Sequence, residues 1–154
     1  MAPSHGHPSL ILPPPVLFGL NLALGGGLQR IMPWFIVAGQ LIWLGMAAIG
    51  FGLAVSLWAV VTMHRAGTAV DPRRTATRLV EHGPFAFSRN PIYLSMAVAS
   101  LGVALWVNSY WLLLSLGVTL AILTYGVIKP EEKYLKDSFG EPYLRYQRRV
   151  RRWF

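Results

Sequence analysis

The chain has 154 residues, of which 54% are hydrophobic and 13% are charged, and it carries a net charge of +8 without any cysteine. Soluble domains contain about 25% charged residues, so this composition argues against a water-soluble domain and predicts an integral membrane protein. The absence of cysteine excludes disulfides, zinc–thiolate sites and thiol nucleophiles. In a membrane protein the basic residues are expected at the cytoplasmic surface, so we expect the lipid bilayer, and no nucleic acid, as a partner.

Two apolar stretches precede the main polar loop. Residues 1–15 form an N-terminal tail that lacks the basic start of a signal peptide. Three consecutive prolines end this tail and leave Val16–Leu28 as the expected first helix. At 1.5 Å per residue this helix covers roughly 20 Å, less than the ~30 Å hydrocarbon core, so it is either a tilted span or a re-entrant piece. The uncharged run Pro33–Met63 predicts a long second span that begins at Pro33.

Small residues are frequent in this second span. Glycines at positions 39, 45, 50 and 52 are expected to allow close helix packing. The pair Gly50-x-Gly52 could instead let a ligand approach the backbone.

A polar loop and an apolar hairpin follow. The loop, residues 64–90, carries five arginines against two acidic residues, which predicts a cytoplasmic position. Pro91 opens the run Ile92–Val107, Asn108-Ser109 makes a tight turn, and Tyr110–Ile128 returns. This order predicts about four transmembrane helices within residues 16–128, with both termini cytoplasmic.

The C-terminal tail, residues 129–154, is polar and compatible with helices interrupted near Gly140 and Pro142. The basic cluster Arg148–Arg152, with Trp153 and Phe154, is typical of a membrane-surface anchor. The predicted fold is therefore an all-α integral membrane protein: a single domain, residues 1–154, with a C-terminal helical hairpin and a cytoplasmic loop and tail.

The two ends of the hairpin carry the candidate chemistry. Arg89, Asn90 and Tyr93 enter it, and Glu131 and Glu132 leave it. Because a two-residue turn makes the helices antiparallel neighbours, these ends are expected roughly 10 Å apart. Taken singly, the same residues have ordinary explanations. Arg89 can mark a helix end, Asn90-Pro91 is a common helix start with Asn as the N-cap, and the glutamates can simply be solvated.

Several catalytic patterns are absent. The sequence contains no GxGxxG after a strand, P-loop, HExxH, GxSxG or CxxC, and its four histidines show no ligand spacing. Soluble nucleotide-binding enzymes, serine hydrolases and metal sites therefore have no support in the sequence.

The motifs at and after the polar loop occur in a characteristic order. They are Gly83-Pro84-Phe85, Arg89-Asn90-Pro91-Ile92-Tyr93, Glu131-Glu132 and Phe139-Gly140-Glu141-Pro142-Tyr143-Leu144-Arg145-Tyr146. From about Gly50 to Arg152 the chain resembles the isoprenylcysteine carboxyl methyltransferase and phospholipid methyltransferase superfamily. Its members are small integral-membrane enzymes that use S-adenosylmethionine.

The resemblance implies a cofactor site and a methyl acceptor that is hydrophobic or lipid-linked. Arg78 or Arg89 would hold the carboxylate of S-adenosylmethionine, and Glu131 its ammonium or ribose. Glu132 is a candidate general base if the acceptor is an amine. The full set of implied cofactor contacts is Thr77, Arg78, Leu79, Val80, Phe85, Arg89, Asn90, Pro91, Ile92, Tyr93 and Glu131.

Two positions depart from the superfamily pattern. Asn90 stands where the pattern has histidine. Phosphatidylethanolamine methyltransferases are similar to this chain in having asparagine at that position. Val127 stands where prenylcysteine enzymes have an arginine linked to the substrate carboxylate. Both departures favour methyl transfer in general over prenylcysteine methylation.

Two other functions remain as alternatives. The first is an NADPH-dependent membrane reductase of the sterol type, whose C-terminal pattern is similar; the short chain and the Glu-Glu pair argue against it. The second is a small transporter or non-catalytic membrane protein. Transport usually requires ionisable residues within the spans, and Pro33–Met63 and Ile92–Ile128 contain no Asp, Glu, Lys, Arg or His.

Overall fold

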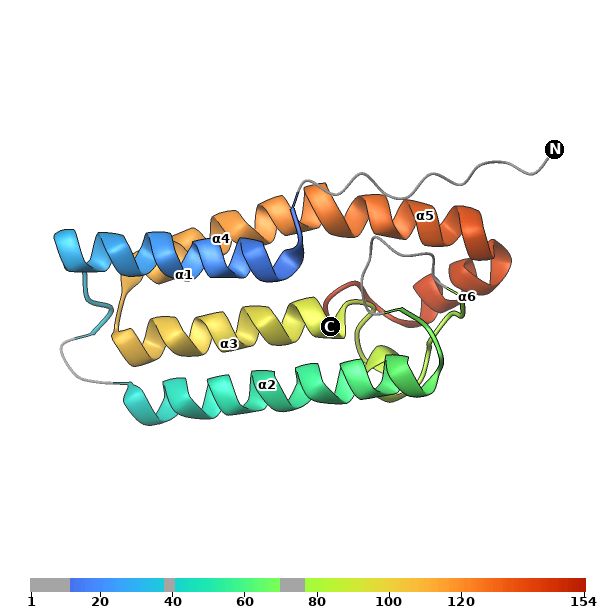
Figure 1. The fold of residues 1–154 in the computed structure, drawn as a ribbon, viewed down its shortest axis with the longest axis horizontal. Helices are drawn as coiled ribbons and strands as arrows, with labels where there is room; N and C mark the ends of the chain where they lie inside the picture. The colour runs from blue at the N-terminus through green and yellow to red at the C-terminus, as the bar shows by residue number, and fades with distance from the viewer. Residues whose placement is uncertain (1–11, 38–40, 70–76) are drawn as a thin grey trace.

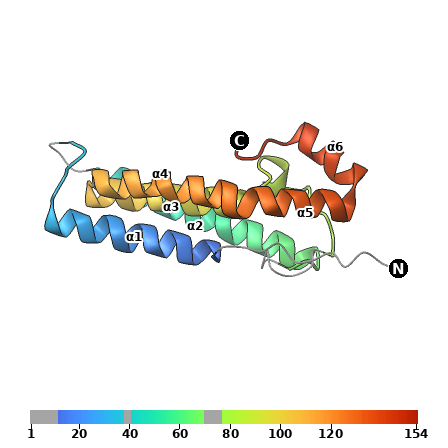
Figure 2. The ribbon, with the colours of Figure 1, turned by 90° about the horizontal axis from the view of Figure 1, so that it is seen from above.

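A computed structural model describes residues 12–37, 41–69 and 77–154, and within these residues the chain is helical without strands. The elements are α1 (Pro14–Ile31), α2 (Ile42–Arg65), the 3-10 helix η1 (Gly83–Ala86), α3 (Pro91–Val107), α4 (Tyr110–Leu123), the π-helical η2 (Thr124–Ile128), α5 (Lys129–Phe139) and α6 (Glu141–Arg149). The long helices α1 to α4 lie side by side, and α6, the C-terminus and the loop before α3 gather at one end (Figure 1). Seen from above, α4, η2 and α5 form one continuous rod (Figure 2).

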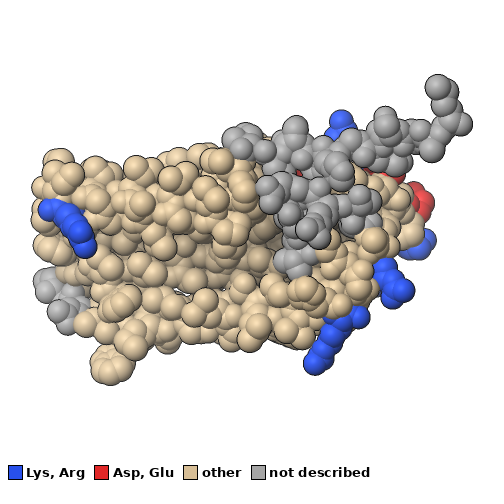
Figure 3. Space-filling view, viewed as in Figure 1, with Lys and Arg blue, Asp and Glu red and all other residues tan. Residues whose placement is uncertain are grey.

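The predicted all-helical fold is confirmed. Two helices in the described part of the chain are long and apolar enough to cross a membrane, Ile42–Arg65 and the continuous helix Tyr110–Phe139, and α3 is a shorter apolar helix. The 24 residues of α2 correspond to about 36 Å, enough to span the hydrocarbon core. The count of four spans and the cytoplasmic orientation remain predictions. On the face in Figure 3, charged side chains gather mainly at the end that contains α5 and α6.

The first helix is longer than predicted. It starts at Pro14 and not at Val16, because Pro14 and Pro15 occupy its first turn, where a backbone N–H has no acceptor within the helix. It also continues past Leu28 to Ile31. Most of the predicted N-terminal tail, residues 1–11, lies outside the described residues.

The predicted helix start at Pro33 is wrong, since α2 begins at Ile42. The N–H of Trp34 donates to Oε1 of Gln29 at 3.2 Å, and the N–H of Ile36 donates to Oδ1 of Asn108 at 3.1 Å. These bonds attach the segment after α1 to Gln29 of α1 and to Asn108, which lies between α3 and α4, so the segment does not extend α2. Residues 38–40, which complete this connection, lie outside the described part.

Close packing of α2 on α3 explains two of the four glycines singled out in the sequence. A Cβ atom at Gly45 would lie 2.6 Å from the carbonyl oxygen of Gly102, and one at Gly52 would lie 2.6 Å from that of Ser95. The packing prediction is therefore confirmed for Gly45 and Gly52. It is wrong for Gly50, where an added Cβ atom would meet no described atom of another helix within 4 Å, and Gly39 lies outside the described residues.

The turn between α3 and α4 fixes the geometry of the hairpin. Asn108 adopts the left-handed conformation with φ 56°, and the side chain of Ser109 accepts the N–H of Leu112 at the start of α4. The predicted Asn108-Ser109 turn is confirmed. It makes α3 and α4 antiparallel, so the start of α3 and the junction of η2 with α5 lie at the same end of the molecule (Figure 1).

Candidate functional site

The start of α3 contacts the start of α5 through one hydrogen bond. The hydroxyl of Tyr93 donates to Oε2 of Glu131 at 3.0 Å. Tyr93 is buried among apolar residues of α1, α3, α4 and η2. The structure thus brings together the two ends of the hairpin, as the antiparallel turn predicts, and places a phenol against a carboxylate at this point.

Glu132 joins two arginines from distant parts of the chain. Its Oε1 lies 3.1 Å from Nη1 of Arg89, and Arg152 donates from Nε at 2.9 Å and from Nη2 at 2.7 Å, one bond to each carboxylate oxygen. The side chains of Arg89 and Glu132 are 11% and 12% exposed. The hydrogen bonds to Glu132 raise the pKa of the Arg152 guanidinium above its ordinary value. Both glutamate oxygens are therefore engaged by positive charge.

Arg89 has unused hydrogen-bonding capacity. Its Nε and Nη1 atoms are buried and make no hydrogen bond to a described acceptor, although Nη1 is within ion-pair distance of Glu132. A buried donor without an acceptor costs about 1–3 kcal/mol and asks for an explanation. A carboxylate is the group that best satisfies adjacent guanidinium N–H donors. The site therefore fits a ligand that carries a carboxylate.

The C-terminal segment lies along the loop that enters α3. The backbone N–H of Arg89 donates to the carbonyl of Arg151 at 3.0 Å, and the carbonyl of Arg152 accepts from Ser88 Oγ at 3.2 Å and from Asn90 Nδ2 at 3.0 Å. Asn90 is the N-cap residue of α3, but its side chain does not cap the helix. The predicted helix start is therefore confirmed, with Asn90 at the N-cap position and Pro91 in the first turn. The side-chain amide of Asn90, however, binds the tail and does not cap the helix.

The tyrosines of α6 close the tail over the loop. The hydroxyl of Tyr146 donates to the carbonyl of Phe85 at 2.7 Å, and Arg149 forms an ion pair with Glu81. Burial, together with the nearby charge of Glu132, raises the pKa of Tyr143, and burial raises that of Tyr146. The two tyrosines form an apolar cluster with Val150, and Leu79, Leu135 and Phe139 pack against it.

Gly83 positions this loop on α2. Its φ is +63°, and a Cβ atom there would lie 3.2 Å from Oγ1 of Thr62. The positive φ and the lack of room for a side chain beside Thr62 both favour glycine at this position. As a result η1 can rest on α2 and present Phe85 to Tyr146.

The predicted cofactor residues fall into three groups. Residues 89–93 and Glu131 meet at the hairpin end, and Leu79, Val80 and Phe85 lie in or beside the packed loop. Thr77 is exposed and binds the end of α2, where its Oγ1 donates to the carbonyl of Gly67 at 3.0 Å. Arg78 is exposed as well. The structure does not bring these last two residues to the Arg89–Glu132 pair.

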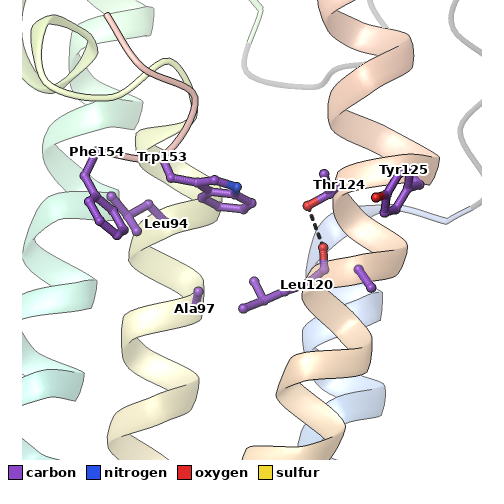
Figure 4. Close-up of a pocket in the computed structure, with 8 residues that line it drawn as sticks. Leu94, Ala97, Leu120, Thr124, Tyr125, Trp153 and Phe154 are labelled. Carbon is purple, nitrogen blue, oxygen red and sulfur yellow. Dashed lines mark hydrogen bonds between the residues drawn. The ribbon is translucent and has the colours of Figure 1, made fainter.

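A cavity of about 460 Å³ lies beside this site, between α3 and the rod of α4 and η2 (Figure 4). Its wall is apolar apart from the Thr124 hydroxyl, which donates to the carbonyl of Leu120 at 2.7 Å, and the exposed ring of Tyr125. The cavity therefore reaches the outer surface of the helices. Its lining residues are Leu94, Ala97, Leu120, Ala121, Thr124, Tyr125, Trp153 and Phe154.

Sequence reasoning missed Arg152 and Trp153 as parts of this region. They were expected to belong to a membrane-surface anchor, but Arg152 binds Glu132 and Trp153 lines the cavity. The reason is Val150, whose extended backbone ends α6 and returns the chain toward Ser88. No local pattern reveals this, because Ser88 and Asn90, which hold the tail through the carbonyl of Arg152, are more than sixty residues away from it in the sequence.

Comparisons with known proteins identify one matching family model and two similar proteins. The family model described as phospholipid methyltransferase matches residues 41–142. An uncharacterised protein of Haemophilus influenzae is 34% identical over 62 residues, which cover 40% of this chain and 98% of that protein. The cobalt-zinc-cadmium resistance protein CzcN of Cupriavidus metallidurans is 26% identical over 118 residues, which cover 77% of this chain and 50% of CzcN. No solved structure matches.

Proposed function

The chain belongs to the phospholipid methyltransferase family, and we propose that it transfers a methyl group from S-adenosylmethionine to a hydrophobic or lipid-linked acceptor in the membrane. The observation that carries this proposal is the buried guanidinium of Arg89, which pairs with Glu132 through Nη1 but whose Nε donor has no acceptor among the described residues. Glu131, the residue before Glu132, accepts the hydroxyl of Tyr93. S-adenosylmethionine has a carboxylate that can accept hydrogen bonds from Arg89. It also has an ammonium group and ribose hydroxyls that can donate to Glu131.

Each residue of the site then has a defined task. Arg89 binds the carboxylate of the cofactor, and Glu131 binds the ammonium group or the ribose of the cofactor. Tyr93 orients the side chain of Glu131 through its hydrogen bond. When bound, the cofactor supplies an electrophilic methyl group, which an acceptor lone pair takes as the carbon–sulfur bond breaks. Such a displacement depends on alignment and on the exclusion of water. The buried tyrosines of α6 contribute to the exclusion of water because they cover the loop.

Glu132 fits a holding role better than that of general base. Its two oxygens bind Arg152, and one of them also pairs with Arg89. A carboxylate so occupied has little capacity to accept a proton from a substrate. We therefore propose that Glu132 fixes the orientation of Arg89 and attaches the tail to α5. Asn90 supports the same arrangement by binding the carbonyl of Arg152.

The cavity between α3 and α4 supports a hydrophobic acceptor. Its volume lies in the range of small-molecule sites, and its wall is formed mainly by aliphatic and aromatic side chains. Tyr125 and Phe154 on its rim are exposed, so the cavity is accessible from the side of the bundle that would face lipid. An acceptor that enters sideways from the bilayer would arrive one helical turn from Tyr93.

Transfer of a labelled methyl group tests the proposal. Purified protein in vesicles made from the lipids of its expression host would be incubated with S-adenosylmethionine tritiated on the methyl group. We expect label in the organic extract, and its loss in Glu131→Ala. The exposed Glu141→Ala is the matched control and retains transfer. Label that stays in the aqueous phase, together with protection of the protein by NADPH against thermal unfolding, would favour the reductase alternative.

A further inference from the structure

We propose that Trp153 is a specificity-determining residue: its indole forms the wall that limits how far an acceptor chain penetrates from the cavity toward Tyr93. This inference rests on the proposed function, because it assigns the cavity to the acceptor.

The position of the indole is the first observation. Trp153 lines the cavity and also packs against the buried cluster that includes Tyr93, Ala97 and Val127. In Figure 4 its ring extends from the C-terminal segment across the space between α3 and η2, with Leu94 on one side and Thr124 on the other. One residue thus borders both the cavity and the apolar layer around the predicted site.

The second observation is that Trp153 is held in place. The preceding residue, Arg152, is fixed through its carbonyl, which accepts from Ser88 and Asn90, and through its guanidinium, which binds both oxygens of Glu132. A membrane-surface anchor needs no such attachment. A rigid attachment is what a wall of fixed position requires, since a mobile indole would not discriminate by length.

The neighbouring Phe154 shows the contrast. It also lines the cavity, but its side chain is 83% exposed, whereas Trp153 is half-buried. Loss of the Phe154 ring would widen the rim, and loss of the Trp153 indole would deepen the cavity toward Tyr93. The two aromatic residues therefore form a matched pair for substitution.

The experiment uses two photoreactive alkyl amines, with chains of eight and sixteen carbons and a diazirine at the chain terminus. Each is irradiated with the full-length protein in phosphatidylcholine vesicles, and mass spectrometry locates the adducts. In the wild type we expect adducts on the cavity side, at Leu94 and Leu120, and few at Tyr93. Trp153→Ala should move adducts of the longer amine to Tyr93. It should also raise labelling by the longer amine relative to labelling by the shorter amine by about tenfold, which is the discrimination that a small change in an apolar pocket gives.

Three controls make the outcome decisive. Phe154→Ala should keep the wild-type adduct positions. Ala121→Leu, at an exposed cavity position, should reduce labelling by both amines without changing the folded core. Trp153→Phe, which keeps an aromatic wall, should give the wild-type pattern and covers the case in which Trp153→Ala does not fold. Adducts at Tyr93 in the wild type, or the same pattern in a folded Trp153→Ala, would overturn the proposal.

Calorimetry on the same preparations separates this inference from the proposed function. S-adenosylhomocysteine should bind wild type and Trp153→Ala alike. If it binds neither while the adducts move as expected, the wall exists but the methyltransferase proposal fails. If it binds both and the adducts do not move, the proposed function stands and the wall is wrong.

Discussion

The hydroxyl of Tyr93 and the carboxylate of Glu131 are joined by a hydrogen bond of 3.0 Å, although the two residues are 38 positions apart and belong to different helices. This bond links the start of α3 to the start of α5. It joins the two residue groups that the sequence places at either end of the apolar hairpin.

Replacing Tyr93 with phenylalanine should weaken cofactor binding while the fold is kept. The ring still fills its place among the buried residues, but Glu131 loses the donor that orients it. The lost bond corresponds to about 1–3 kcal/mol, which raises the dissociation constant of S-adenosylhomocysteine roughly fivefold to 150-fold. Calorimetry measures it, and Tyr110→Phe, at the opposite end of the bundle, serves as the control. Unchanged affinity in Tyr93→Phe would remove this residue from the site.

Arg89 and Arg78 can be distinguished as carboxylate ligands. Arg89 is buried with unused donors, and Arg78 is exposed. Arg89→Gln should raise the dissociation constant of S-adenosylhomocysteine by about tenfold to a hundredfold, which corresponds to the loss of a charge-assisted hydrogen bond. Arg78→Gln should have little effect on this constant. Methylthioadenosine, which lacks the carboxylate, should bind Arg89→Gln as well as it binds the wild type. Equal weakening of both ligands would show that Arg89 acts only by supporting the fold.

Glu132 and Arg152 should be coupled in stability. Each single variant, Glu132→Gln or Arg152→Gln, breaks a two-bond ion pair in which the side chain of Glu132 is 12% exposed and that of Arg152 is 33% exposed. Double-mutant analysis of thermal unfolding in detergent should give a coupling of about 1–3 kcal/mol. The exposed pair Arg148–Glu141 should give much less, in keeping with surface ion pairs. A coupling for Glu132–Arg152 no larger than that of the exposed pair would contradict the holding role.

Glycine substitutions test the packing that supports the site. Gly52→Ala places a methyl group 2.6 Å from the carbonyl oxygen of Ser95, so α2 and α3 must separate. We expect a loss of about 1–3 kcal/mol in stability, the usual range for overpacking. Gly50→Ala, two residues away and facing open space, should be neutral or slightly stabilising. The reverse order of the two variants in a thermal unfolding series would refute the observed α2–α3 contact.

The hairpin end was predictable because local rules determine it. A two-residue turn forces antiparallel helices, and Pro91 marks a helix start, so the approach of Tyr93 to Glu131 follows from spacing. The start of α2 was not predictable in this way. Asn108, seventy-two positions away, binds the N–H of Ile36 and holds the preceding segment out of the helix. A helix-start preference at Pro33 is weaker than these tertiary hydrogen bonds.

The tail shows the same limit at the site itself. The break at Gly140 was predicted, and its positive φ is the conformation that glycine favours. The return of Arg152 to Glu132 and of Trp153 to the cavity depends on contacts with Ser88 and Asn90. Ser88 and Asn90 directly precede α3, so those contacts depend on where the fold places the start of that helix. The charge pattern of the tail is equally compatible with a membrane surface, which is why the sequence favoured an anchor.

The most direct test of the account is calorimetric titration of the purified protein in detergent with S-adenosylhomocysteine and, separately, with NADPH. We predict saturable binding of S-adenosylhomocysteine by the wild type and by Glu141→Ala, its loss in Glu131→Ala, and no heat of binding with NADPH. Binding of NADPH without S-adenosylhomocysteine, or equal affinity of the wild type and Glu131→Ala for S-adenosylhomocysteine, would contradict the proposed site.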